Sequence, residues 1–411
     1  MSGQRGKIRA MKILHTSDWH LGRDIHGYDL GPDQVNAINF IADEAIARKV
    51  DVVLIAGDVY DLARPAGDDI TRLRQVLKRF HDADIHVILT AGNHDSGERL
   101  GAYGGLLADK LHVFGMVEDA GTAVEIHDEH GPVLFYPLTF LDPNEARFVL
   151  AEAKAEPLAR SHEAVMAEAM RRVRADIASR GGSARSVVVA HAFVTKGGES
   201  DEELKSEQCE SERDIAVGGV PTIPSSVFAG TNYVALGHLH GPRNVVIGTD
   251  GPTIRYSGSI LRYSLSEAKH SKSFSIIDLP ADGNVTDAHI EVIDIPQPCG
   301  MARLTDSLDE LLSSKYDQHH NDFVELNVTD MFPEPNYYAK LEHKFKRILT
   351  HSTGRPDFVR HGDEDLGPIT ERDPMELMKS FYKQSTSDEM SDKMTEILRN
   401  AYEQALKQVT K

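Results

Sequence analysis

The stretch Asp51-Val-Val-Leu-Ile-Ala-Gly-Asp-Val-Tyr-Asp61 decides how the rest of this chain is organised. Its apolar run from Val52 to Ala56 is followed by a glycine and a carboxylate, which is typical of a strand buried on both faces that leads into a loop. Asp58 is therefore expected at the carboxyl end of a central strand, where open α/β sheets place their reactive groups.

Four further apolar runs end in the same way. Each delivers Asp, His or Asn side chains where a strand is expected to stop. In chain order these side chains are Asp18 and His20, then Asn93, His94 and Asp95, then His191, and finally His238 and His240. For any one histidine, a partly buried imidazole with satisfied hydrogen bonds is the more frequent role. Five of them at strand ends beside Asp and Asn favour a metal site instead.

The donor types indicate which metals fit. Asp, Asn and His supply hard oxygen and borderline nitrogen ligands, which suit Mn²⁺, Fe²⁺ or Zn²⁺ better than Ca²⁺. Two ions that share a carboxylate and hold a phosphoryl group lie roughly 3.5 to 4 Å apart, and this requires about seven protein ligands. The sequence offers Asp18, His20 and His240 for one ion, Asn93, His191 and His238 for the other, and Asp58 as the bridge.

Three further polar residues of these loops receive other roles. His94 directly follows a ligand and completes neither shell, so it is predicted to donate a proton or stabilise charge at the scissile phosphate. Asp61 and Asp95 are predicted to fix the orientation of a ligand or of a backbone turn rather than to bind an ion directly.

Composition limits the class of protein. A chain of 411 residues favours two or more domains, and its two cysteines, Cys209 and Cys299, exclude a disulfide framework or a thiolate cluster. The formal charge of −19 argues against a surface that binds nucleic acid everywhere, but not against a DNA enzyme whose cations are metals or come from a partner. No apolar run is long enough for a bilayer and residues 1–10 lack a signal-peptide core, so no membrane association and a cytoplasmic location are expected.

Hydrophobic periodicity divides the chain into segments. Two βαβ units up to Thr90 predict a parallel sheet, alternating runs from about Gly121 predict hairpins, and residues 145–180 predict a long helix interrupted near Pro157. The charged stretch that begins at Gly197 is expected to be an exposed loop. After Pro298 an α-β-α run is predicted, with one helix through Leu304, Leu308, Leu311 and Leu312, a strand at 323–328 and a second helix at 338–349.

The last segment, 373–411, predicts two helices, the second with an apolar stripe of Met390, Met394, Ile397, Leu398, Ala401 and Tyr402. For an arbitrary terminal helix, packing on the protein's own body is the more frequent explanation. The Asp- and Gly-rich stretch 361–366, which separates these helices from the preceding segment, and the adaptable Met side chains favour a partner instead.

The loop motifs resemble those of the calcineurin-like metallophosphoesterases. They are D-x-H at Asp18 and His20, G-D-x-x-D at Gly57 to Asp61, G-N-H-D at Gly92 to Asp95, a lone His191, and G-H-x-H at Gly237 to His240. Within that superfamily the chain is similar to the SbcD-type nuclease subunits, through these stretches and Tyr256-Ser-Gly-Ser259. The resemblance implies an α/β fold, a four-layer β-sandwich flanked by helices at 11–296 after a disordered lead-in at 1–10. It also implies a small α/β capping domain at 297–362, a linker at 363–372 and C-terminal helices at 373–411.

The same resemblance implies an activity and partners. The activity would be a Mn²⁺-dependent DNA nuclease, with Mg²⁺ as an alternative in the second site. It would act as a 3′ to 5′ exonuclease on double-strand ends and as an endonuclease on hairpins and single strands, in DNA repair, recombination and replication. The partners would be DNA, a second copy of the chain, and an SbcC-type ATPase whose coiled coil the C-terminal helices grip, in a heterotetramer with two chains of each kind.

Two other functions fit the same scaffold. One is a phosphatase or cyclic-nucleotide phosphodiesterase, although the Arg-Gly after G-D-x-x-D and the G-N-H-E typical of phosphoprotein phosphatases do not occur here. The other is a binding subunit with a decayed site, against which the complete ligand set argues.

Overall fold

The computed structural model describes residues 10–102, 104, 109–152, 156–197, 212, 222–248, 251–330, 333–354, 374–386 and 389–409. The chain divides into two compact units, Met1–Gly300 and Met301–Lys411. Residues 1–9 of the lead-in predicted at 1–10, most of the charged loop after Gly197 and the linker predicted at 363–372 lie outside the described residues.

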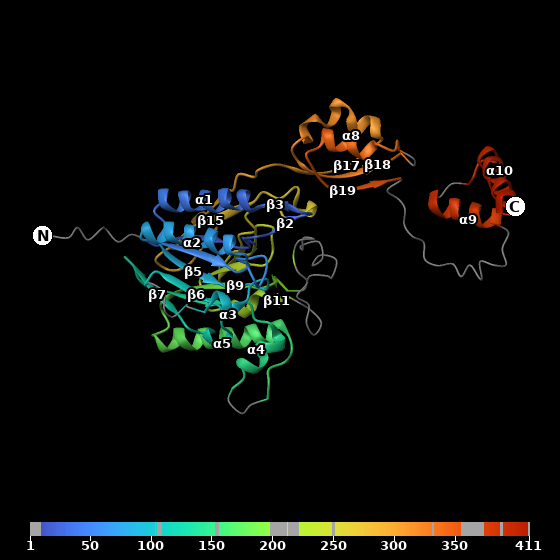
Figure 1. The fold of residues 1–411 in the computed structure, drawn as a ribbon. Helices are drawn as coiled ribbons and strands as arrows, with labels where there is room; N and C mark the ends of the chain where they lie inside the picture. Colours follow the sequence, from blue (N-terminus) through green and yellow to red (C-terminus); the bar gives the residue numbers. More distant parts are fainter. Residues whose placement is uncertain are drawn as a thin grey trace. The chain divides into compact units, whose positions relative to one another are not determined.

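The first unit contains two six-stranded sheets. One has the order β16 (Ile290–Asp294), β15 (Ser273–Asp278), β1 (Lys12–Thr16), β4 (Val52–Ala56), β5 (His86–Thr90) and β6 (Leu111–Phe114). Strands β1, β4, β5 and β6 are parallel, as the βαβ pattern predicted, and β15 joins β1 antiparallel. Helices α1 (Gly31–Ala47) and α2 (Gly67–Asp82) connect the first three parallel strands and cover one face (Figure 1).

The second sheet has the order β13 (Arg243–Val246), β14 (Thr253–Tyr256), β12 (Tyr233–Gly237), β9 (Arg185–His191), β8 (Gly131–Leu138) and β7 (Val124–Asp128). Helices α4 (Pro143–Val149) and α5 (His162–Ser179) cover its outer face, so four layers follow one another as helix, sheet, sheet and helix (Figure 1). The four-layer α/β prediction is therefore confirmed. The predicted interruption near Pro157 also holds, because Ser161 begins α5 by accepting a hydrogen bond from the Ala164 N–H at 3.2 Å.

The core between the sheets explains why the central strands lack alternation. Val52, Leu54 and Ala56 of β4 face Val187 and Val189 of β9 in one buried cluster, while the other sides of both strands pack against helices. Burial on both faces requires apolar residues at every position of such a strand. Short elements complete this unit: β2 (Asp24–Ile25), β3 (Tyr28–Asp29), α3 (Gly97–Leu100), η2 (Val117–Asp119), β10 (Val194–Thr195), β11 (Ile223–Pro224), η3 (Ser225–Phe228), η4 (Leu265–Glu267) and η5 (Asp287–His289).

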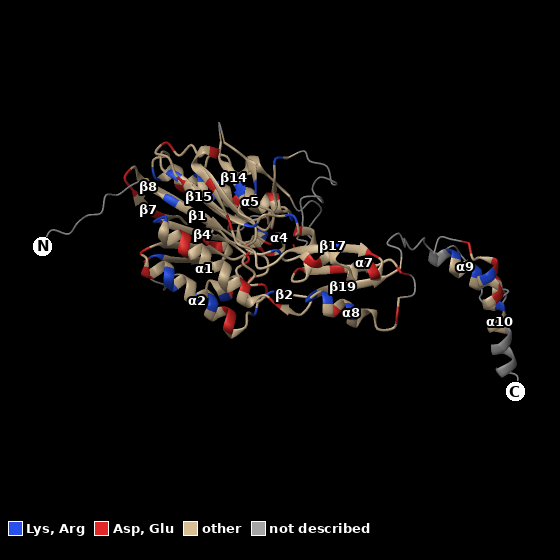
Figure 2. Cartoon of the chain, turned by 90° about the horizontal axis from the view of Figure 1, so that it is seen from above, with Lys and Arg blue, Asp and Glu red and all other residues tan. Residues whose placement is uncertain are grey.

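Charge on the outer helices is mixed. Figure 2 shows both acidic and basic residues on α2, whose first turn carries Asp68 and Asp69 and whose last turn carries Arg79. Arg79 also donates to the Asn39 side chain of α1 at 2.8 Å, which ties the two helices together. The basic residues of α2 offset its acidic ones, so this helix does not contribute to the negative formal charge of the chain.

The second unit begins with a three-stranded parallel sheet, β17 (Met301–Asp306), β18 (Phe323–Val328) and β19 (Arg347–Thr353). Its connections hold α7 (Leu308–Leu312), η6 (Ser314–His319) and α8 (Tyr337–Lys344). Leu304, Leu326 and Leu341 meet in its core.

Two predicted helices of this unit are wrong in extent. Leu304 was expected on a helix but lies in β17, because Ser307 caps α7 by accepting from the Glu310 N–H, so the helix begins after it. The helix expected at 338–349 ends at Lys344, and Arg347 starts β19. Such short apolar runs fit either period, and pairing with β18 decides for a strand.

The chain continues with α9 (Pro374–Thr386) and α10 (Asp392–Val409) (Figure 1). The Tyr382 hydroxyl lies 3.6 Å from the Met394 sulfur, which places the two helices in contact. Phe381 is 70% exposed and Ile397 60% exposed. Among the described residues, no helix has both the length and the apolar character needed to cross a bilayer.

Candidate metal centre

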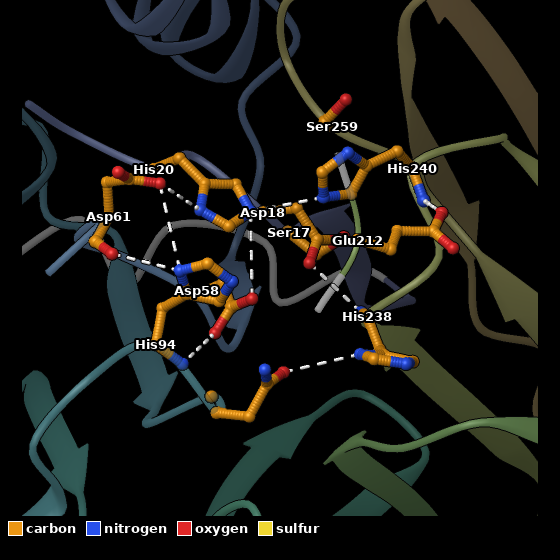
Figure 3. Close-up of polar contacts among 12 residues, drawn as sticks. Ser17, Asp18, His20, Asp58, Asp61, His94, Glu212, His238, His240 and Ser259 are labelled. Atoms are coloured by element: carbon orange, nitrogen blue, oxygen red, sulfur yellow. Dashed lines mark hydrogen bonds and ion pairs between the residues drawn. The ribbon is translucent and has the colours of Figure 1, made fainter. Parts of the chain in front are cut away.

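The predicted ligands lie together where five strands end. β1, β4 and β5 are neighbours in one sheet and β9 and β12 are neighbours in the other, so their carboxyl ends meet at one edge of the sandwich. Figure 3 shows the side chains of Asp18, His20, Asp58, His238 and His240 directed into one space. These five and His191 are at most 2% exposed, and Asn93 is half-buried.

The backbone of this centre is held in an uncommon conformation. Asp18, His20, Asp58 and His238 have φ angles of 52°, 45°, 47° and 103°, in the left-handed region that residues other than glycine rarely adopt. Backbone hydrogen bonds fix the first loops: the Asp18 N–H donates to Gly57 O at 3.1 Å and the His20 N–H to Asp58 O at 2.9 Å. Such strain persists only where surrounding structure enforces it, and here it turns the side chains inward.

Two glycines permit the close approach of these loops. A Cβ at Gly57, whose φ is +80°, would lie 2.3 Å from His191 Nδ1, and a Cβ at Gly92 would lie 2.1 Å from Asp58 Oδ1. Both distances are far inside van der Waals contact. The glycines before Asp58 and Asn93 are therefore required by packing around the ligands.

One half of the centre contains Asp18, His20 and His240, with one donor atom from each within 4.8 Å of the others. The Nε2 atoms of His20 and His240 are 3.1 Å apart. Asp18 is oriented by the His238 N–H at 3.0 Å and by the Ser17 hydroxyl at 2.5 Å.

The other half contains Asn93, His191 and His238. Asn93 Oδ1 lies 2.8 Å from His191 Nε2 and 3.3 Å from His238 Nδ1. His191 Nδ1 donates to the Ala56 carbonyl at 3.0 Å, which leaves Nε2 as the ligand atom. Asp58 Oδ2 lies 3.6 Å from His20 Nε2 and 3.4 Å from His191 Nε2, so this carboxylate stands between the halves.

The pKa values reflect the close approach of the charged groups in this centre. Burial lowers the pKa of His191, but the Asp58 carboxylate outweighs it and raises that pKa to about 9. Burial raises the pKa of Asp58, yet His191 and His20 bring it well below its usual value. Burial and His191 hold the pKa of His238 well below its ordinary value. A protonated His191 therefore balances the negative charge of Asp58. A cation bound between the two side chains could balance that charge in place of the proton.

These residues fit divalent cations. Their donor set mixes carboxylate oxygen, amide oxygen and imidazole nitrogen. One donor atom each from Asp18, Asp58 and His191 lies within 4.8 Å of the others, as in the group of Asp18, His20 and His240, so each group is compact enough to surround one ion. Two imidazole nitrogens 3.1 Å apart likewise favour a shared proton or cation between them.

His94 joins the centre at its edge. The backbone N–H of His94 donates to Asp58 Oδ1 at 2.9 Å, and the ring Nδ1 lies 2.9 Å from the Asp61 carbonyl oxygen. Since a carbonyl oxygen can only accept, Nδ1 carries a proton in this contact. His94 also forms a compact group with His20 and Asp58, a geometry that would equally permit ligation.

Asp61 and Asp95 lie behind the ligands. Asp61 Oδ1 is 3.2 Å from His20 Nδ1 and 3.3 Å from Arg23. Asp95 accepts the N–H groups of Val59, Tyr60 and Gly92 at 2.9 to 3.0 Å, which joins the loops after β4 and β5. Burial, and to a smaller extent the charge of Asp58, raises the pKa of Asp95 to about 7, although the three hydrogen bonds lower it.

Sequence reasoning missed two residues near the centre. Glu267 and Lys272 are buried and paired, and Glu267 Oε1 lies 3.4 Å from His240 Nδ1. They follow the Tyr256-Ser-Gly-Ser259 stretch, which pointed to this segment, but charged residues in a Ser-rich run give no periodic signal of burial.

Comparison with known proteins gives two matches to families. Residues 11–242 match the calcineurin-like phosphoesterase family, and residues 298–386 match the SbcD C-terminal family, described as the type 5 capsule protein repressor C-terminal domain. Among solved structures, TT1561 of Thermus thermophilus is 13% identical over 70% of this chain and 100% of that chain, with a TM-score of 0.41. A dimetal phosphatase from Danio rerio is 13% identical over 70% of this chain and 99% of that chain, with a TM-score of 0.42.

Proposed function

The chain belongs to the calcineurin-like phosphoesterase family, and from this premise we propose that it is the DNA nuclease subunit of an SbcD-type complex. The observation that carries the proposal is the succession of two matches in one chain. A phosphoesterase domain at 11–242 is followed by an SbcD C-terminal domain at 298–386. The reaction is hydrolysis of phosphodiester bonds, as a 3′ to 5′ exonuclease on duplex ends and as an endonuclease on hairpins and single strands.

The candidate centre would hold two divalent cations, Mn²⁺ in preference, with Mg²⁺ as an alternative in the second site. In this assignment Asp18, His20 and His240 would hold one ion, Asn93, His191 and His238 would hold the other, and Asp58 would serve as the bridge. When bound, the two cations polarise the phosphoryl oxygen and lower the pKa of a water molecule.

The other polar residues act around this centre. His94 donates a proton to the leaving oxygen or stabilises charge on the phosphate, with its ring oriented by the Asp61 carbonyl at 2.9 Å. Asp61 orients His20 through the contact of 3.2 Å between its carboxylate and Nδ1. Asp95 holds the loops that carry Asp58 and Asn93 in register through its three backbone hydrogen bonds.

The partners follow from the same assignment. The nuclease works as a homodimer in the cytoplasm, in DNA repair, recombination and replication. Residues 297–362 form a capping domain that contacts DNA. Helices α9 and α10 bind the coiled coil of an SbcC-type ATPase in a heterotetramer, and the exposure of the apolar Phe381 and Ile397 side chains supports this assignment.

One assay separates the competing functions. The purified protein is incubated with Mn²⁺ and an end-labelled duplex, a labelled hairpin, or p-nitrophenyl phosphate. We expect cleavage of both DNA substrates, loss of cleavage with a chelator, and little hydrolysis of the monoester. Rapid monoester hydrolysis with intact DNA would indicate a phosphatase, and no hydrolysis of any substrate by metal-loaded protein would indicate a binding subunit.

A further inference from the structure

A charged pair lies in the core behind the candidate metal centre. Glu267 ends η4 and Lys272 directly precedes β15, and neither side chain is exposed to solvent. Burying two charges is expensive in free energy, and replacing such a pair with apolar residues is often neutral or stabilising. A pair of this kind therefore calls for a reason other than stability.

Both members of the pair contact His240. The Lys272 ammonium donates to the His240 carbonyl oxygen at 2.8 Å, to the Ser259 hydroxyl at 2.9 Å and to Glu267 Oε2. Glu267 Oε1 lies 3.4 Å from His240 Nδ1 and accepts from the Ser264 hydroxyl at 3.2 Å. His240 is thus held at its ring by Glu267 and at its backbone by Lys272.

We propose that Glu267 is a positioning residue for His240 and that Lys272 keeps Glu267 in place. A carboxylate that accepts from Nδ1 fixes the neutral tautomer in which Nε2 carries no proton and can therefore act as a metal ligand. His240 Nε2 is also the atom that lies 3.1 Å from His20 Nε2, inside the centre. The ammonium supplies the opposite charge and two further hydrogen bonds, which keep the carboxylate in one orientation.

Glu267 should affect the affinity for only one of the two ions. His20, a ligand of the same ion, also has a carboxylate beside its ring, because Asp61 Oδ1 lies 3.2 Å from its Nδ1. His191 instead donates to the neutral carbonyl of Ala56. Carboxylates that back both imidazoles raise their basicity, so the ion at Asp18, His20 and His240 should depend on Glu267, and the ion at Asn93 and His191 should not.

The test measures Mn²⁺ binding by calorimetry and by the electron paramagnetic resonance signal of free Mn²⁺, without substrate. The main variant is Glu267→Gln with Lys272→Met, which removes both charges and nearly preserves shape. We expect a folded protein that binds one Mn²⁺ as the wild type does and the second about 10- to 100-fold more weakly. Glu267→Gln alone should weaken the same ion and also lower the melting temperature, because Lys272 is left as an uncompensated buried charge.

A matched control exists in the same two-sheet unit. Arg185 and Asp128 form another buried ion pair, with Arg185 Nη1 2.9 Å from Asp128 Oδ2. Arg185 begins β9 and His191 ends it, so this pair is about 20 Å along the strand from the centre. Asp128→Asn with Arg185→Met should change the melting temperature but not the affinity for either Mn²⁺.

Three outcomes would overturn the proposal. The Glu267 and Lys272 double variant could bind both ions with wild-type affinity, it could lose both equally, or both Glu267 variants could fail to fold while the control pair folds. The last result would assign the network to stability alone. The proposal uses the metal centre of the proposed function, but its readout is independent of nuclease activity. A wild type that binds two Mn²⁺ and leaves DNA intact would therefore refute the nuclease assignment and not this one.

Discussion

The metal centre and the C-terminal helices depart from ordinary burial in opposite directions. At the centre, polar and charged side chains such as Asp18, His20 and His240 are at most 1% exposed. On α9 and α10, Phe381 and Ile397 are mostly exposed although they are apolar. Folding removes apolar surface from water and pairs buried polar groups, so each departure marks a candidate binding site. The first offers donor atoms suited to cations, and the second offers exposed apolar side chains suited to an apolar partner.

The strongest test of this comparison is Asp58→Ala. Without the carboxylate between the two halves, both cations repel each other across the site, so we expect Mn²⁺ binding and DNA cleavage to be lost together. The loss of activity should be roughly 10³-fold or more, as for other groups on which a whole site depends. Asp51→Asn is the control, because Asp51 lies just before the other end of β4 and accepts from the Lys12 N–H at 2.7 Å. Retention of two Mn²⁺ per chain by Asp58→Ala would contradict the bridging role.

A smaller loss is expected for His94→Gln. If His94 transfers a proton without holding an ion, kcat for DNA should fall about 10²- to 10⁴-fold while both Mn²⁺ remain bound. Calorimetric titration with Mn²⁺ and single-turnover cleavage would measure the two effects separately. Loss of one Mn²⁺ in this variant would make His94 a ligand, in keeping with its proximity to His20 and Asp58.

Changes in the C-terminal helices α9 and α10 are expected to have almost no effect on DNA cleavage. Deleting residues 373–411 should leave Mn²⁺-dependent cleavage of short DNA within about twofold of the full chain, but abolish co-purification with the ATPase subunit. Ile397→Asp should weaken co-purification by itself, because binding of an apolar surface cannot accommodate an unpaired buried charge. Asn400→Asp on the same helix is the matched control for the added charge.

Two results would contradict the partner assignment. Undiminished pull-down of the ATPase by the truncated chain would exclude these helices as the binding surface. Aggregation of the truncated chain would indicate that the helices pack on the protein's own body.

The smallest effect on activity is expected for His15, a buried histidine whose two ring nitrogens both have hydrogen-bond partners. His15 lies close in sequence to Asp18, but its Nδ1 is 3.0 Å from the Tyr233 hydroxyl and its Nε2 is 3.1 Å from the Leu236 carbonyl. Burial, with Arg255, lowers the pKa of His15 to about 3. The unfolded chain therefore takes up this proton near pH 6.5 and the folded protein does not.

As the pH falls from about 6.5 to about 3, His15 should reduce the free energy of unfolding by up to about 1.4 kcal/mol per pH unit. Nuclease activity at neutral pH should not depend on this titration. Urea unfolding between about pH 7 and about pH 4 should show a shallower decline for His15→Gln, which keeps a donor and an acceptor without titrating. Parallel declines in the two proteins would show that His15 is not the responsible group.

Local chemistry made much of this protein predictable. The uninterrupted apolar run of β4 required a strand buried on both faces, and the residues after it required a polar loop. The same reasoning located the ends of β1, β5, β9 and β12, and the structure brings all of the predicted site residues to one edge of the sandwich. It failed at Leu304, where a short apolar run fits a helix and a strand equally well.

The amino-acid sequence by itself determined which side chains follow each strand and hence the chemical type of the centre, because strand burial and donor chemistry are properties of neighbouring residues. Only the tertiary structure decided that His240 is backed by Glu267, that Lys272 is buried, and that Asp18, Asp58 and His238 adopt positive φ. These features depend on loops from two sheets that meet in space. A buried carboxylate and a solvated one are the same letter in a sequence, and the packing of distant segments determines which of the two it becomes.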